Sequence, residues 1–69
     1  MTEFPVRTPI KLVQFLKLTG IAESGAHATA LVASGEVSVN GAVCGARSHQ
    51  LGAGDTVTVG GESFTVTEQ

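Results

Sequence analysis

The dipeptide Asn40-Gly41 constrains the fold of this chain most, because it lies between two short runs of strand-forming residues, 37–39 and 42–44. Asn-Gly in this setting is the strongest short-range signal for a hairpin with a two-residue turn of type I′. With such a turn, Val37 faces Cys44 across the strands. Cys44 is therefore predicted to lie on the apolar side as a small buried residue rather than a reactive thiol.

A second hairpin is predicted around Gly60-Gly61, between residues 56–59 and 64–67, where apolar residues alternate with threonine. Its predicted inward side chains are Val57, Val59, Phe64 and Val66. Between the two hairpins, Leu51 is expected to be a buried anchor, followed by a glycine-containing turn.

Two short amphipathic helices are predicted before the first hairpin. Thr8 and Pro9 are typical of an N-cap and a first helical residue, so we expect the first helix to begin there and to end at Gly20. Its predicted apolar arc is Leu12, Val13, Phe15 and Leu16, opposite Lys11, Gln14 and Lys17. Ser24 is the predicted N-cap of a second helix, which ends at Gly35. Its inward residues are Ala28, Leu31 and Val32.

A chain of 69 residues, 42% of them apolar, is long enough for one small core. We expect a single domain over residues 1–69 with a core motif over about 9–67. The predicted fold class is α+β, with two short helices packed on a small, mainly antiparallel sheet of three to five strands. Residues 1–8 either add an edge strand around Phe4 to Val6 or fray.

Charge is unevenly distributed along the chain, whose net charge is −2. Residues 1–17 carry a local charge of +2, whereas residues 48–69 carry −3 and no Lys or Arg. The molecule is therefore predicted to be a dipole with one basic end. Such a dipole can orient an anionic ligand, and it is equally compatible with ordinary surface charge that keeps a protein in solution.

Several functional classes find no support in the sequence. No apolar run approaches the roughly 20 residues that span a bilayer, and the N-terminal residues do not follow a signal-peptide pattern, so we predict a cytoplasmic protein without membrane contact. His27 and His49 have no cysteine or carboxylate partners at metal-ligand spacing. We expect no metal, no cofactor, no small-molecule substrate and no catalysis, since so short a chain leaves little room for a substrate pocket of at least about 300 Å³.

An ordered set of short segments over about residues 10–66 carries a family resemblance. The segments are Phe15-Leu16-Lys17-Leu18, Glu23-Ser24-Gly25, Ala28, Gly35, Val37-x-Val39-Asn40-Gly41-Ala42-Val43, Arg47 and Leu51-x-x-Gly54-Asp55-x-Val57. This set resembles the RNA-binding domain first named from the fourth protein of the small ribosomal subunit, whose helix-loop-helix-hairpin core is called the αL motif. It is most similar to the short stand-alone bacterial members. The resemblance implies a non-catalytic protein that binds structured RNA, of the ribosomal or transfer RNA class, through phosphate contacts, with a protein or ribosomal partner as a further option.

The resemblance points to Lys17, Ser24, Gly25 and Arg47 as RNA contacts. A helix N-terminus attracts phosphate oxygens, and the planar fork of Arg47 suits phosphate, which makes Arg47 the foremost candidate. The predicted set is completed by Lys11, His27, Thr29, Ser48, His49 and Gln50. The family commonly has further Lys or Arg near positions 29, 46, 49 and 50, where this chain has Thr29, Ala46, His49 and Gln50. We therefore expect modest affinity, supported by neutral hydrogen bonds.

Other interpretations stay open at this point. Lys11 and Lys17 also fit a solvated helix face, and Ser24 fits a cap alone. With no Trp or Tyr, and Phe4 as the only aromatic residue outside the expected core, stacking along a single strand is not expected. One alternative function is a protein-interaction module on the same fold. Another is a ubiquitin-like sulfur carrier, although Gly60-Gly61 is not at the end of the chain.

Overall fold

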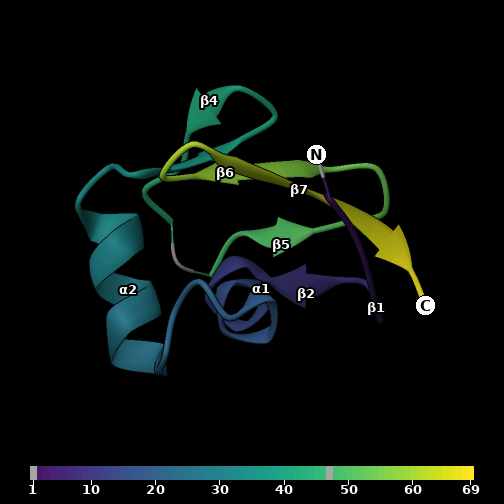
Figure 1. Cartoon of the computed structure of the whole chain (residues 1–69), viewed down its shortest axis with the longest axis horizontal. Coiled ribbons are helices and arrows are strands. Elements are labelled where there is room, and N and C mark those ends of the chain that lie inside the picture. Colours follow the sequence, from purple (N-terminus) through teal and green to yellow (C-terminus); the bar gives the residue numbers. More distant parts are fainter. Residues whose placement is uncertain (1, 47) are drawn as a thin grey trace.

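The computed structural model describes residues 2–46 and 48–69 and shows two helices on one side of a five-stranded sheet (Figure 1). The elements are β1 (Thr2–Val6), β2 (Ile10–Lys11), α1 (Leu12–Thr19), α2 (Gly25–Ala33), β3 (Val37–Val39), β4 (Ala42–Val43), β5 (Gln50–Leu51), β6 (Thr56–Val59) and β7 (Glu62–Glu68). The sheet order is β1-β7-β6-β3-β4, and β2 and β5 form a separate antiparallel pair. Only the β1–β7 pairing of the large sheet is parallel, so the predicted α+β class is confirmed.

Both predicted hairpins are present. Asn40 and Gly41 have φ angles of 52° and 85°, as a type I′ turn requires at both central positions. The first hairpin pairs in the predicted register, with Val39 opposite Ala42 and the N–H of Cys44 donating to the carbonyl of Val37 at 2.9 Å. In the second hairpin, Val57 lies opposite Phe64. Cys44 is half-buried and packs against the core.

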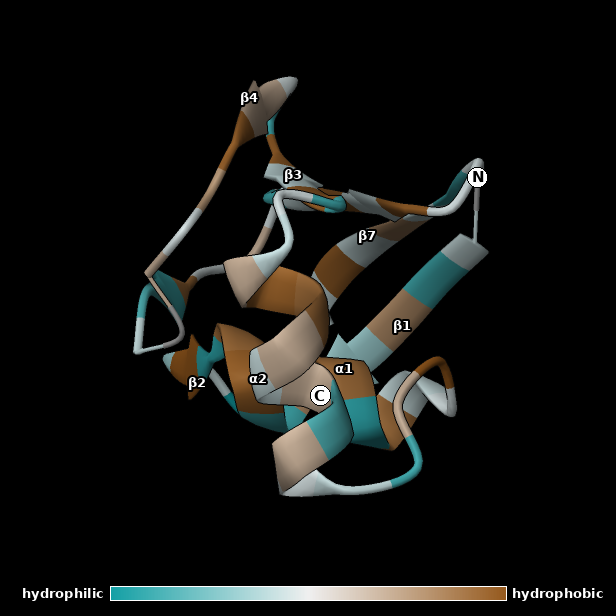
Figure 2. Ribbon diagram, turned by 90° about the vertical axis from the view of Figure 1, so that its left-hand side faces the viewer, coloured by the Kyte–Doolittle hydropathy of each residue, from teal (hydrophilic) through white to brown (hydrophobic). Residues whose placement is uncertain are grey.

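The core lies between the helices and the inward face of the sheet. Apolar segments, brown in Figure 2, occur on both helices and along the strands that face them. Its largest fully buried side chains are Phe15, Leu12, Leu16, Leu51, Val32, Val37, Val57 and Val66. Two large apolar side chains among the described residues stay exposed instead, Leu18 at 53% and Val43 at 67%.

The first helix begins later than predicted. It begins at Leu12, because Ile10 and Lys11 pair with β5 as a short strand instead of forming a first helical turn. Thr8 is not a cap, since its hydroxyl and its backbone N–H both donate to the carboxylate of Glu68 at the end of β7. The Thr8–Pro9 peptide bond is cis. The predicted ends of both helices near Gly20 and Gly35 are confirmed.

Residues 2–6 form a strand, so the edge-strand alternative is the correct one for this segment. β1 lies parallel to β7 with Phe4 opposite Val66, and Gln69 donates its N–H to the carbonyl of Val6 at 2.9 Å. The expectation that Phe4 stands apart from the core is wrong. Its ring meets the ring of Phe15 edge-on, with centroids 5.7 Å apart.

Candidate nucleic-acid interface

Residues 48–50 lie beside the start of α1, although nearly forty residues of sequence separate them. Lys11 pairs with Gln50 in the short β2–β5 ladder. The N–H of Leu12, the first residue of α1, donates to the carbonyl of His49 at 2.8 Å. Because this bond uses one of the N–H groups that a helix start leaves free, it fixes the 48–50 segment to the helix.

The start of α2 is capped as predicted. The Ser24 hydroxyl oxygen accepts a hydrogen bond from the N–H of His27 at 3.1 Å. In return, Nδ1 of His27 accepts from the N–H of Glu23 at 3.1 Å. The hydroxyl of Thr29 donates to the carbonyl of Gly25 at 2.9 Å. These bonds satisfy one of the N–H groups that the start of α2 leaves free and stabilise its first turn.

A hollow of about 300 Å³ lies where these two regions meet. We call it the phosphate hollow, because the groups that line it suit an oxyanion. It is lined by Lys11, Val13, Gly25, Thr29 and Ser48. Four of these five residues belong to the predicted set, and they come from the start of α1, the first turns of α2 and the loop before β5. One ammonium group, the hydroxyl of Ser48 and a helix start thus meet at a small concave surface, a combination that suits an oxyanion such as phosphate, while the Thr29 hydroxyl already donates to the carbonyl of Gly25.

The other predicted residues lie around this hollow or away from it. Ser24 and His27 are exposed at the start of α2, and His49 and Gln50 are exposed beside Ser48. Lys17 is exposed in the last turn of α1 and does not line the hollow. Arg47, the foremost candidate from the sequence, lies outside the described residues.

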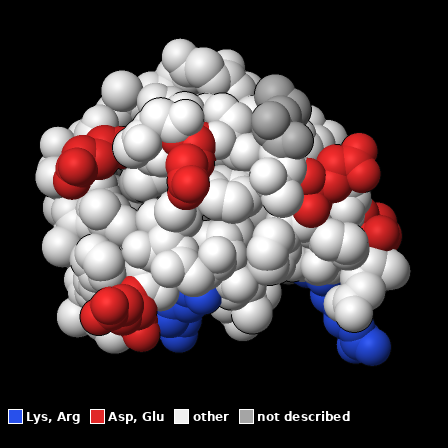
Figure 3. Space-filling model, viewed as in Figure 1, with Lys and Arg blue, Asp and Glu red and all other residues white. Residues whose placement is uncertain are grey.

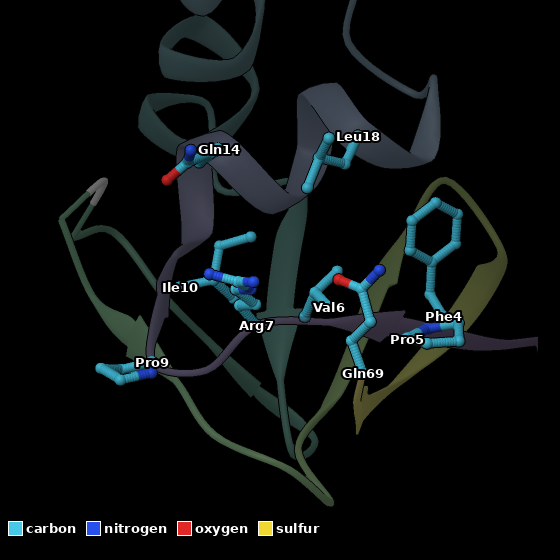
Figure 4. Close-up of a pocket in the computed structure, with 9 residues that line it drawn as sticks. All are labelled: Phe4, Pro5, Val6, Arg7, Pro9, Ile10, Gln14, Leu18 and Gln69. Carbon is cyan, nitrogen blue, oxygen red and sulfur yellow. The ribbon is translucent and has the colours of Figure 1, made fainter.

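A larger groove on the other flank of α1 was not predicted from the sequence. It measures about 550 Å³ and is lined by Phe4, Pro5, Val6, Arg7, Pro9, Ile10, Gln14, Leu18 and Gln69 (Figure 4). We call it the apolar groove. Its volume exceeds the roughly 300 Å³ that is common for the smallest substrate pockets, so this short chain has more room on its surface than the sequence suggested. The described residues that line the groove contribute no imidazole, thiol, hydroxyl or side-chain carboxylate.

The signal for this groove was an apolar residue on the polar side of the predicted helix. Leu18 interrupts the arc of Lys11, Gln14 and Lys17, and it is exposed beside the groove in the structure. The sequence alone did not reveal the opposite wall, because β1 reaches this position only by pairing with β7.

A hydrogen-bonded bridge joins the first hairpin turn to the turn after β5. The amide of Asn40 donates to Asp55 at 3.2 Å and accepts from the N–H of Thr56 at 3.0 Å. Asp55 also accepts from the N–H of Gly52 at 2.8 Å. The Gly52 bond, then the Asn40 bond, and finally the charge of His49 lower the pKa of Asp55, while burial opposes them. Asp55 therefore stays ionised and anchors the chain directly after β5.

On the face shown in Figure 3, the visible Lys and Arg atoms gather at one edge, in agreement with the predicted basic end. In Figure 3 the blue Lys and Arg atoms lie along the lower edge, on the side of the helices. Red Asp and Glu atoms occupy the upper and lateral parts of the same view, and one red group lies next to the left-hand blue group. The basic edge and the phosphate hollow are thus on the same side of the sheet.

Two further searches concern the described residues only. Within residues 2–46 and 48–69, no three His, Cys, Asp or Glu side chains are grouped closely enough to hold a metal ion. Neither α1 nor α2 has the length and apolar character of a membrane-spanning helix.

Comparison with known proteins agrees with this geometry. YbcJ of Escherichia coli K12, named as a candidate RNA-binding protein, is 42% identical over 57 residues, which are 83% of this chain and 81% of YbcJ. The YbcJ protein of Shigella flexneri matches to the same extent. The solution structure of E. coli YbcJ, described as revealing an αL motif involved in RNA binding, superposes with a TM-score of 0.69 at 36% identity, covering 96% of this chain and 84% of YbcJ. The model of the S4 domain family matches residues 6–67. The resemblance inferred from the sequence is thereby confirmed, and the chain belongs to the S4 domain family.

Proposed function

We propose that this protein is a small, non-catalytic RNA-binding domain, comprising residues 1–69, that holds a backbone phosphate of structured RNA in the phosphate hollow. The observation that carries the proposal is the convergence of Lys11, Gly25, Thr29 and Ser48 from three separate segments. The RNA class we propose is ribosomal or transfer RNA, in the cytoplasm. The family match and the description of YbcJ as involved in RNA binding support this choice.

The charge of the chain limits how tightly it can bind. Only four Lys and Arg residues are present, against six Asp and Glu. Each neutralised phosphate contributes a slope of roughly −0.7 to −0.9 to the dependence of log affinity on log salt. We therefore expect weak binding of RNA, with an affinity that depends only weakly on salt concentration. Hydroxyls at the hollow add neutral contacts, which recognition of structured RNA by shape and 2′-hydroxyls can use.

The first experiment measures binding of a stable RNA hairpin at two salt concentrations. Lys11→Gln should weaken binding at low salt and reduce the magnitude of the salt slope by about one unit, because one phosphate contact is lost. Lys17→Gln is the matched control, since it changes the net charge equally but lies outside the hollow. It should have the smaller effect.

A second variant tests the neutral part of the hollow. Thr29→Val keeps the shape of the side chain and removes its hydroxyl. Because that hydroxyl donates to the carbonyl of Gly25, it is left to accept from a 2′-hydroxyl of the RNA, and its loss should weaken binding without changing the salt slope. Equal effects of Lys11→Gln and Lys17→Gln would argue against the hollow as the contact. Absence of RNA binding at low salt would overturn the proposed function and favour the alternative, a protein-interaction module on the same fold.

A further inference from the structure

We propose that the apolar groove receives one unpaired nucleobase of the bound RNA, next to the phosphate held in the phosphate hollow. This inference rests on the proposed function and adds a second contact of a different kind. The proposed RNA-binding surface then includes a phosphate contact on one side of α1 and a base contact on the other.

The position of the groove is the first argument. Lys11 and Val13 line the phosphate hollow, whereas Gln14 and Leu18 line the apolar groove, so α1 separates the two. A helix with its side chains is only about 10–12 Å across. A strand that leaves a phosphate in the hollow can therefore reach the groove by passing over the exposed side of α1.

Charge complementarity is the second argument. Arg7 is the only charged side chain among the described residues that line the groove, and it is exposed. The described cations of the chain are Arg7, Lys11 and Lys17, all within β2, α1 and the segment just before them. A polyanion that follows this basic edge meets Arg7 at the groove, where a guanidinium can bind a phosphate or stack on a base.

The chemistry of the walls is the third argument. Leu18 points from α1 toward the strands, where Phe4 and Gln69 rise opposite it (Figure 4). Phe4 and the proline rings of Pro5 and Pro9 supply flat apolar surface, and the amides of Gln14 and Gln69 supply donors and acceptors. A nucleobase has the matching properties, because its faces are apolar and its edge carries donors and acceptors. The volume of about 550 Å³ lies within the range of pockets that hold small organic groups.

Because the groove contains a single aromatic ring, the proposed contact is limited to one base. The chain has no Trp or Tyr, so no platform exists for a run of stacked bases. Phe4 is half-buried and held against Phe15, so its ring is fixed rather than free to rotate out. A single base in a preformed groove is what this arrangement can accept.

The test compares two RNA hairpins that differ by one bulged nucleotide. The unsubstituted protein should bind the bulged hairpin about five- to ten-fold more tightly than the fully paired one, because base stacking contributes at the low end of its usual range. Leu18→Ala should reduce this preference and leave binding of the paired hairpin nearly unchanged. Arg7→Gln should also reduce the preference, and it should weaken binding of both hairpins because it removes one cation from the basic edge. Val43→Ala is the matched control, an exposed apolar residue on the distant edge strand β4, and it should keep the preference.

A fluorescence measurement provides a readout that a change in stability would not mimic. Because the chain has no tryptophan, Leu18→Trp creates a single reporter at the groove and Val43→Trp one far from it. The bulged hairpin should quench the fluorescence of Leu18→Trp more than the paired hairpin does, with no such difference for Val43→Trp.

The outcomes separate the two proposals. Equal affinity for both hairpins and equal quenching would overturn the base contact while leaving the phosphate hollow intact, and would make a protein side chain the better occupant of the groove. Loss of binding to both hairpins in Leu18→Ala would also overturn it. Failure of the unsubstituted protein to bind either hairpin would overturn the proposed function as well.

Discussion

Asp55 is the residue on which the local geometry behind the phosphate hollow depends. Its carboxylate joins the N–H of Gly52, directly after β5, to the amide of Asn40 in the first hairpin turn. β5 in turn holds Gln50 against Lys11. A single carboxylate thus links the hairpin turn to the segment that supplies Ser48, which makes Asp55 a positioning residue rather than a ligand contact.

Asp55→Ala should lower the free energy of unfolding by about 1–2 kcal/mol at pH 7, because it leaves two donors without their acceptor. The pKa of Asp55 is lowered in the folded state, so its contribution is complete above the pKa of the unfolded chain and is lost as the pH falls through the folded value. Urea unfolding should therefore show the full difference in the free energy of unfolding between the unsubstituted protein and Asp55→Ala at about pH 6. The difference should become smaller below about pH 4. A difference that is the same at both pH values would contradict this account.

At the scale of elements, the parts predicted correctly are those whose signals are local. Asn40 and Gly41 adopt the positive φ angles that their turn requires. Ser24 caps α2 by accepting a hydrogen bond from the N–H of His27, three residues later. The start predicted for α1 was wrong because Ile10 and Lys11 pair with a strand that lies about forty residues later in the sequence. No local pattern near Thr8 reveals this pairing. Four of the ten residues that the sequence predicts as RNA contacts line the phosphate hollow, whereas the apolar groove depends on the β1–β7 pairing and was not predicted.

Ser24→Ala tests the cap at the start of α2. It should cost about 1 kcal/mol of stability, because the N–H of His27 loses its acceptor. It should also weaken RNA binding, since the first turn of α2 carries Gly25 at the edge of the phosphate hollow. Ser34→Ala, at the other end of the same helix, is the control and should leave RNA affinity unchanged in the same titration.

The whole molecule has the fold of the S4 domain family but carries few cations. Its net charge is −2, and the described cations are confined to residues 7–17. His49 and Gln50, at positions where the family resemblance implies further basic residues, are exposed beside the hollow. Affinity in this protein should therefore be limited by charge rather than by fold.

The double substitution His49→Arg with Gln50→Lys should raise affinity for an RNA hairpin and steepen the salt slope by up to about two units. Ala30→Lys with Ala33→Arg adds the same charge to the exposed side of α2, nearer its C-terminal end, and should change the slope less. Equal gains from both pairs would show that net charge alone, and not its placement, governs binding.

The parallel pairing of β1 with β7 has a consequence for how the chain folds during synthesis. Thr2 aligns with Phe64 and Val6 with Glu68, so β1 is synthesised well before the strand with which it pairs. Contacts of such long sequence separation form late and slow the overall folding of a small domain. Until β7 is available, Phe4 and Val6 have no strand to join, and the wall of the apolar groove that β1 supplies exists only once β7 has been made.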